Sequence, residues 1–298
     1  MKERRVVDMK GTVVTALLTA SLCPLAMAQV NAPPLTEVIE QVRPSVVRIV
    51  IDYKMSIQDD VPANSPPQPN SGQVSGTGFI LDDLGHIGTA AHVIDTSIIE
   101  QEMVNDLKAV HRHVVPGTLH FGDISISFPM KSTQDLNGGQ IFHGDIYAND
   151  FRISGARVLK EDSHLDIAVL TCGVNPTKTL GAEINGIQSF LAKAPKLHRA
   201  LPADGEMIAV SGFPLNIPVL VTNVGWIASS YFRDETNRSL YLGSILVNEG
   251  NSGGPAYDAT DGSILGCVVQ YRISQRGNNS GLTVIVPVQT FLNLLSGT

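Results

Sequence analysis

The chain has few cysteines, no excess of basic residues and no apolar run long enough to span a membrane comfortably. Three cysteines in 298 residues are too few for a disulfide-rich scaffold. The formal net charge of −7 argues against nucleic acid or an anionic membrane as a partner, because both attract clustered Lys and Arg. The longest apolar stretch is shorter than the roughly 20 residues that a membrane-spanning helix needs. The chain is nevertheless long enough to bury the core of one large or two small domains.

Residues 1–28 are typical of a secretory signal peptide. Basic residues precede the apolar run VVTALLTASLCPLAMA, which ends in Ala26-Met27-Ala28. We expect cleavage before Gln29 and a periplasmic or secreted protein, with an uncleaved anchor as the alternative. Cleavage changes the formal charge from −7 to −9, because the segment holds four basic and two acidic residues. The two remaining cysteines, Cys172 and Cys267, lie in apolar strand-like runs, and we expect them to be buried and unbridged.

The rest of the chain predicts an all-β protein. Apolar residues from Leu35 to Val42 have helical spacing, with Thr36 as a candidate N-cap, and Pro44 ends this helix. Residues 56–76 are rich in Pro, Ser, Asn and Gln, which favours a surface loop. Many short strands then follow, separated by Gly, Asn, Asp and Pro, which is typical of antiparallel barrels or sandwiches. Alternating strand–helix units, which would indicate a parallel sheet, are missing; the long region 95–150 holds one helix-like piece, and PVQTFLNLL predicts a C-terminal helix.

A glycine-flanked serine raises the question of catalysis. Ser252 lies in NEGNSGGPAYD, which matches the G-x-S-x-G pattern of the α/β-hydrolase nucleophile elbow. In that fold the histidine follows the serine, whereas the last histidine of this chain is His198. A histidine base for Ser252 must therefore come from upstream, and the α/β-hydrolase order is excluded.

Two upstream residues complete a candidate triad. His92 lies in TAAHV among small residues, which leave room for a substrate beside the imidazole. Asp166 opens the apolar strand HLDIAVL, where a carboxylate is costly unless a partner compensates it. Each could also be structural, His92 as a half-buried residue at a strand end and Asp166 as a turn cap.

Taken together, SGTGFI, GTAAHV, HLDIAVL and NEGNSGGPAY resemble the trypsin-like serine peptidases of the HtrA (Deg-type) branch, and the likeness covers most of the chain after residue 28. The resemblance implies two six-stranded antiparallel β-barrels, residues 29–200 (with an N-terminal helix and a long insertion at about 95–150) and 201–298, with the active site between them. It also implies that His92 is the general base, Asp166 its orienting acid and Ser252 the nucleophile. The backbone N–H groups of Gly250 and Ser252 would form the oxyanion hole.

Several features refine this expectation. Asn251 stands where amine-activated relatives carry an aspartate, so we expect no activation by a new N-terminus. The chain ends just past the protease core, so we expect no PDZ domain. A trimer is common among HtrA relatives. Leu246, with Val268 or Val269, predicts an apolar pocket for the substrate residue before the scissile bond.

We expect protein or peptide substrates and no cofactor. A metal site is not expected at the histidines of the 95–150 region, which lack a regular ligand pattern and which we take as solvated: His111, His113, His120 and His143. Two other functions stay open, a peptide-binding chaperone with a dormant triad and an esterase that uses the same triad.

Overall fold

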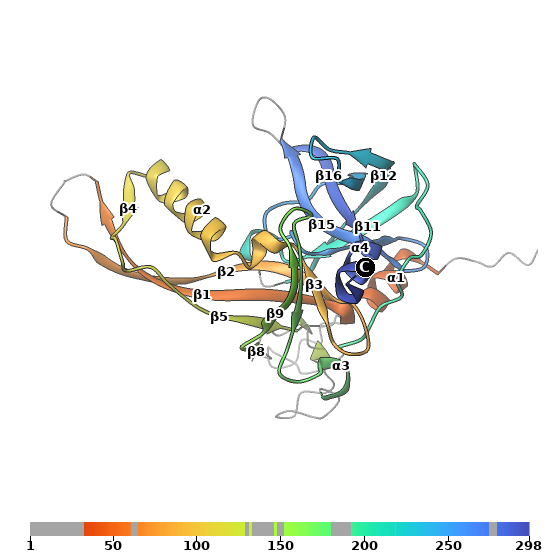
Figure 1. Cartoon of the computed structure of the whole chain (residues 1–298), viewed down its shortest axis with the longest axis horizontal. Coiled ribbons are helices and arrows are strands. Elements are labelled where there is room, and N and C mark those ends of the chain that lie inside the picture. The colour runs from red at the N-terminus through yellow and green to blue at the C-terminus, as the bar shows by residue number, and fades with distance from the viewer. Residues whose placement is uncertain are drawn as a thin grey trace, which may run out of the picture. The chain divides into compact units, whose positions relative to one another are not determined.

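An antiparallel β-sheet and a closed β-barrel form the two main parts of the fold (Figure 1). The computed structural model describes residues 33–60, 65–128, 131–132, 146–147, 152–179, 192–217, 219–273 and 279–297. The predicted signal peptide 1–28 lies outside these residues. Among the helices that the structure describes, none combines the length and the apolar character that crossing a membrane requires.

The first half is an eight-stranded antiparallel sheet in which β8, β5, β1, β2, β3, β10 and β9 lie side by side and β4 pairs with β1. A separate pair joins β6 to β7. The strands are β1 (Val46–Asp59), β2 (Gln68–Ile80), β3 (Ile87–Thr89), β4 (Arg112–Val114), β5 (His120–Ser127), β6 (Lys131–Ser132), β7 (Ile146–Tyr147), β8 (Arg152–Ser154), β9 (Arg157–Asp162) and β10 (Ile167–Thr171).

The second half is a closed barrel of six antiparallel strands in the order β11-β12-β13-β16-β15-β14. These are β11 (Met207–Gly212), β12 (Val221–Arg233), β13 (Ser239–Ser244), β14 (Pro255–Asp258), β15 (Ile264–Ile273) and β16 (Asn279–Pro287). Prediction and structure agree on the fold class, with one difference. The first half is an open, curved sheet over the described residues, because β8 and β9 at its edges do not pair with each other.

Two terminal helices pack on a core that both halves share. Helix α1 (Leu35–Val42) buries Val38 and Val42, and α4 (Val288–Ser296) buries Val288 and Phe291. These side chains belong to one cluster with Phe79 of β2 and apolar residues of the barrel. The ring of Phe291 meets that of Phe79 edge to face at 5.7 Å. The same cluster thus fixes the first half against the second, next to the segments that carry the predicted site.

Both terminal helices were predicted, but the prediction of Thr36 as the N-cap of the first one is wrong. Helix α1 begins at Leu35 with Pro34 in the N-cap position and no side-chain cap. Thr36 therefore lies within the first turn. After Val42 the chain forms a single 3-10 turn, η1 (Arg43–Ser45), that contains Pro44, because proline cannot continue the hydrogen-bonding pattern of an α-helix.

The surface loop predicted at residues 56–76 is wrong for residues 56–59 and 68–76, which belong to strands β1 and β2. Strands β1 and β2 pair in register from Val46↔Phe79 to Ile57↔Gln68, and Figure 1 shows the hairpin running far from the barrel beside α2. Strand β1 also pairs with β4 and β5, so the hydrogen bonds of the ladder outweigh the turn-rich composition. The region 95–150 was predicted as an insertion, and it contributes strands β4 and β5 to this sheet. It also contains the predicted helix, α2 (Thr96–Ala109).

Candidate active site

His92 and Asp166 lie next to the ends of two neighbouring strands of the first half, β3 and β10. His92 lies in the 3-10 turn η2 (Ala91–Val93) after β3, and Asp166 directly precedes β10. Antiparallel pairing of Thr89 with Ala168 brings the two segments together. The Asp166 carboxylate bonds His92 twice: Oδ2 lies 2.8 Å from Nδ1, and Oδ1 accepts from the His92 N–H at 3.0 Å. The carboxylate therefore holds both the ring and the backbone of His92.

The backbone of Asp166 is itself constrained. Its φ of 56° lies in the left-handed region, which is uncommon for residues other than glycine and which Asp tolerates better than most. Its carbonyl accepts from the N–H of Ala91 at 3.1 Å. Just upstream, the carbonyl of His164 accepts from the Arg238 guanidinium at 3.1 Å. Several independent contacts thus hold a strained turn that aims its carboxylate at His92.

Ser252 lies in the loop between β13 and β14, and two glycines give this loop its shape. Gly250 has a φ of +88° and Gly253 a φ of +85°, values that favour glycine. A β-carbon at Gly250 would collide with the carbonyl oxygen of Phe213, and one at Gly253 with that of Thr77. The glycines around the serine are therefore required by the backbone and by close approach of other segments.

Thr77 of β2 joins the two halves at this loop and was not among the predicted site residues. Its backbone N–H donates to the Ser252 carbonyl at 2.9 Å. Its hydroxyl donates to the Gly250 carbonyl at 2.6 Å and accepts from the Phe213 N–H at 3.0 Å. Thr77 is completely buried, and we regard it as a positioning residue. The only signal in the sequence is its place in SGTGFI, one of the matching motifs.

The three residues of the predicted triad line one cleft of about 640 Å³. The first half contributes His92, Asp166 and side chains of β2 and α2, and the second half contributes Gly250, Ser252 and Val269. The side chains of His92 and Asp166 are 26% and 24% exposed, so the pair is partly screened but open to a substrate. Among the described residues, the Ser252 hydroxyl makes no hydrogen bond to His92. Of the two hydrogen-bonded pairs in the predicted triad, only Asp166–His92 is formed.

The backbone around Gly250 is held on both sides. Its own carbonyl accepts from Thr77, and the Glu249 carbonyl accepts from the Leu215 N–H at 2.8 Å. Within the described part of the chain, no acceptor binds the N–H of Gly250 or of Ser252. These are the two donors predicted for the oxyanion hole, and both belong to residues that line the cleft.

The predicted specificity residues do not all lie together. Val269 lines the cleft although it is only 4% exposed. Val268 is 1% exposed and packs in the interior of the barrel with Ile208 and Val210. Successive side chains of a strand point to opposite faces, so only one of the two valines can reach a substrate. Leu246 is 56% exposed and lies outside the lining of the cleft.

Asn251 and Cys267 are buried, whereas Cys172, which was expected to be buried, is only partly so. Asn251 is completely buried, and its amide has no hydrogen-bond partner among the described residues. Both Cys172 and Cys267 are free, as predicted. Burial raises the pKa of Cys172 to about 11, and burial together with the nearby Asp166 charge raises that of Cys267.

The histidines of the 95–150 region form no metal-ligand cluster over the residues described. His113 pairs with Asp60 at 2.7 Å, and the strand residue His120 is exposed. His111 has a left-handed φ of 57° and accepts at its carbonyl from the Asp60 N–H. His143 lies outside the described residues.

The comparisons with known proteins decide the family. The model of the trypsin-like peptidase domain matches residues 76–266, which include His92, Asp166 and Ser252. The chain belongs to the trypsin-like peptidases. This membership supports the predicted class of enzyme, a serine endopeptidase.

Individual relatives agree with the HtrA branch predicted from the motifs. The chain is 25% identical over 276 residues to serine protease HTRA3 of Homo sapiens, an alignment that covers 88% of this chain and 47% of the relative. The Mus musculus HTRA3 matches equally well, with 46% of its length covered. The chain thus spans about half the length of these relatives. The solved structure of the HtrA-type protease AlgW with decapeptide aligns with 89% of this chain and 67% of the AlgW chain, at a TM-score of 0.57 and 16% identity. This structural similarity confirms the fold.

Proposed function

We propose that the chain is an exported serine endopeptidase that hydrolyses peptide bonds of unfolded or damaged proteins through His92, Asp166 and Ser252. The observation that carries the proposal is the double hydrogen bond from Asp166 to His92 at the wall of a cleft that Ser252 also lines. Export rests on the signal-peptide pattern of residues 1–28. Proteins and peptides are the proposed partners, and self-association into a trimer is proposed from the HtrA resemblance alone.

The geometry suggests how the proton would move. Asp166 accepts the Nδ1 proton of His92, which leaves the lone pair on Nε2. When a substrate enters, Nε2 takes the proton of the Ser252 hydroxyl while that oxygen attacks the scissile carbonyl. His92 then protonates the leaving amine, which departs and leaves an acyl-enzyme. A water molecule, deprotonated by the same nitrogen, hydrolyses the ester and restores Ser252.

The carbonyl oxygen becomes negatively charged in each tetrahedral intermediate. The N–H groups of Gly250 and Ser252 are the donors proposed to stabilise it. The peptide planes that carry these donors are held through the Glu249 and Asn251 carbonyls, which accept from the N–H groups of Leu215 and Gly254. Thr77 holds the adjoining Gly250 and Ser252 carbonyls, so the loop is restrained before the substrate arrives. Such preorganised donors cost no rearrangement during the reaction, and one of them is worth about 3 kcal/mol of barrier.

The lining of the cleft suggests a substrate chemistry. Glu102 and Asp106 of α2 and Glu249 beside the serine line it, and Arg238 is the basic residue among them. The Arg238 guanidinium is already paired with Asp234 at 2.5 Å. We therefore propose that basic substrate residues near the scissile bond are favoured, while Val269 favours an aliphatic residue directly before it.

The test is cleavage of denatured casein by the chain and by Ser252→Ala. We expect fragments only from the unsubstituted chain, with mass spectrometry of the fragments giving the residue before each cut. Equal cleavage by the variant would refute the proposal. A fluorophosphonate that labels Ser252 but not the Ala variant provides an independent measure of nucleophile reactivity.

The second candidate function is a peptide-binding chaperone with a dormant triad, because Ser252 and His92 form no hydrogen bond among the described residues. In that case the fluorophosphonate leaves Ser252 unlabelled although the chain binds unfolded casein. Comparing the turnover of a peptide with that of a simple ester separates the third possibility, an esterase.

A further inference from the structure

Three potential metal ligands from separate segments meet on the second half, away from the cleft. His198 lies in the connection that leads from β10 to β11, Glu206 directly precedes β11, and Asp258 is the last residue of β14. One ligand atom from each lies within 4.8 Å of the other two. Strand pairing explains the proximity of the carboxylates, because Ile208 pairs with Asp258 and the Ala259 N–H donates to the Met207 carbonyl.

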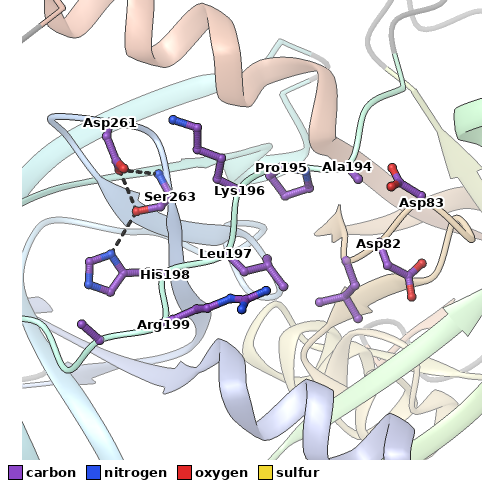
Figure 2. Close-up of a pocket in the computed structure, with 12 residues that line it drawn as sticks. Asp82, Asp83, Ala194, Pro195, Lys196, Leu197, His198, Arg199, Asp261 and Ser263 are labelled. Atoms are coloured by element: carbon purple, nitrogen blue, oxygen red, sulfur yellow. Dashed lines mark hydrogen bonds between the residues drawn. The ribbon is translucent and has the colours of Figure 1, made fainter.

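A hydrogen-bond chain fixes the tautomer of His198 (Figure 2). Asp261 Oδ1 accepts from the Ser263 hydroxyl at 2.6 Å and from the Ser263 N–H at 2.8 Å. Since this hydroxyl proton is directed to Asp261, the Ser263 oxygen accepts from His198 Nδ1, which lies 3.0 Å away. The lone pair of the imidazole is then on Nε2, which Figure 2 shows on the far side of the ring from Ser263.

Each carboxylate is likewise anchored through one oxygen. Glu206 Oε2 accepts from the Ala203 N–H at 2.8 Å. Asp258 Oδ1 accepts from the N–H and the hydroxyl of Thr260 at 2.7 and 2.6 Å. The other oxygen of Glu206, Oε1, is buried and has no hydrogen-bond partner among the described residues. A buried carboxylate oxygen without a donor is costly, and it is an independent sign that a ligand belongs beside it.

A direct ion pair does not account for the cluster. Within the described part of the chain, no salt bridge joins His198 to Glu206 or to Asp258, although the ligand atoms lie within 4.8 Å. Two carboxylates so close together repel each other unless a cation lies near them. Ligand atoms about 2.1 Å from a shared tetrahedral metal would be about 3.4 Å apart, so small side-chain rotations bring the three atoms to that spacing.

We propose that His198, Glu206 and Asp258 bind a divalent transition-metal ion, with Zn²⁺ as the best match. One imidazole nitrogen and two carboxylate oxygens suit zinc, with water in the fourth position. The hydrogen bonds from Ser263, Ala203 and Thr260 orient these ligands from behind, as outer partners do in metal sites. An imidazole ligand argues against Ca²⁺ and Mg²⁺, which prefer oxygen.

The site is placed to hold the connection from β10 to β11 against the barrel of the second half. His198 also lines an open cavity of about 710 Å³ with Lys196 and Arg199 of the connection, whereas Glu206 and Asp258 lie outside its lining. A bound ion would tie the connection to the start of β11 and the end of β14. Since the unfolded chain cannot hold the three ligands together, binding should raise the melting temperature.

The test is calorimetric titration with ZnCl₂ of the untagged chain carrying Ser252→Ala, which prevents self-cleavage. We expect one ion per chain with a dissociation constant of about 10 μM or lower and a rise of several degrees in Tm at saturation. His198→Gln, Glu206→Gln and Asp258→Asn should each weaken binding by at least about 10-fold, and Ser263→Ala by about 10- to 100-fold. His113→Gln, which alters an exposed histidine paired with a carboxylate elsewhere, should leave binding unchanged.

The proposal is overturned if no zinc binds, or if the three ligand variants bind zinc as the parent does. Should a variant fail to fold, Co²⁺ titration of the parent chain decides. Strong visible absorption from a four- or five-coordinate ion supports the site, whereas the weak spectrum of aqueous Co²⁺ refutes it. Because every measurement uses a chain without Ser252, the result is independent of the proposed peptidase activity.

Discussion

The hydroxyl of Thr77 donates a 2.6 Å hydrogen bond to the carbonyl of Gly250. The bond joins the first sheet to the loop that carries the proposed nucleophile, across 173 positions of sequence. Because the same hydroxyl accepts from the Phe213 N–H at 3.0 Å, one buried oxygen holds two segments of the barrel. The shape of the proposed oxyanion hole therefore depends on a residue of the opposite half.

Thr77→Val should impair catalysis more than its effect on folding explains. The change keeps the volume of the side chain but leaves the Gly250 carbonyl and the Phe213 N–H without their partner. We expect a loss of about 1–3 kcal/mol in the free energy of unfolding. Displacement of one oxyanion donor should also lower kcat for a peptide substrate by on the order of 100-fold. Urea unfolding and single-turnover kinetics measure the two effects.

Two further variants separate positioning from stability. Thr77→Ser retains the hydroxyl and should recover most of the lost kcat. Ser45→Ala removes another buried hydroxyl, which donates to the Val42 carbonyl at 2.7 Å. Since neither residue lines the cleft, this variant should destabilise the chain without lowering kcat. If Ser45→Ala and Thr77→Val reduce kcat alike, the effect is general and Thr77 has no positioning role.

The sequence predicts the parts of the site whose chemistry is distinctive, and it misses those that depend on packing. His92, Asp166 and Ser252 were predicted because their order excludes an α/β-hydrolase and matches the trypsin-like motifs, and all three line one cleft. Thr77 was missed because a threonine in a strand has no chemical signature until its partners are known. Val268 and Val269 were both proposed because two adjacent valines in a strand do not reveal which of them faces the cleft and which faces the core.

The long β1–β2 hairpin shows a second limit. Its polar, proline-containing sequence indicates a loop, but the register places Ile57 opposite Val114 of β4 and Tyr53 opposite Phe121 of β5. Pairing with strands more than 50 residues away in the sequence determines the structure of this hairpin, and local composition does not predict such pairing. In contrast, α4 has a continuous apolar face that packs on Phe79, so its periodicity was sufficient.

Asp166→Asn should nearly abolish peptidase activity without removing the side chain. An amide can donate its N–H to His92 Nδ1, which would shift the ring proton to Nε2 and leave no base facing Ser252. The corresponding change in a serine-protease triad costs about 10⁴-fold in kcat, and we expect a similar loss here. Active-site titration and kcat for a peptide measure it. A loss below 10-fold would show that Asp166 does not orient the base.

Asn251→Asp should destabilise the fold in a pH-dependent way. Asn251 is completely buried and its amide lacks partners, so a carboxylate there would be ionised without a compensating cation. We expect a cost of about 3 kcal/mol or more at neutral pH. Because burial favours the protonated form, the penalty should vanish below the unfolded-state pKa of about 3.9 and grow as the pH rises above it. Melting temperatures between pH 3.5 and 7 test this, and a variant as stable as the parent at pH 7 would contradict it.

Cys172 should react slowly with alkylating agents at ordinary pH. Burial raises its pKa to about 11, so the reactive thiolate is a small fraction at pH 8 and increases as the pH approaches 11. We expect the rate of iodoacetamide labelling, followed by peptide mass spectrometry, to rise about 10-fold per pH unit from 8 to 10. Cys172→Ser serves as the control for labelling elsewhere. A rate that levels off near pH 8.5 would show that the thiol is exposed.

The acidic lining of the cleft should determine part of the specificity. The charges of Glu102 and Asp106 on α2 are partly screened by solvent, so each is worth about 0.2–1 kcal/mol towards a basic substrate residue. Glu102→Gln combined with Asp106→Asn should therefore lower kcat/KM for peptides with Lys or Arg near the scissile bond by about 2- to 30-fold, and leave it unchanged for neutral peptides. The preference of the parent should also weaken as salt rises from 0.05 to about 0.5 M, because ions screen exposed charges. Glu100→Gln, on the same helix but outside the cleft lining, is the matched control. An equal loss for basic and neutral peptides would assign α2 a structural role, since charge recognition must discriminate between them.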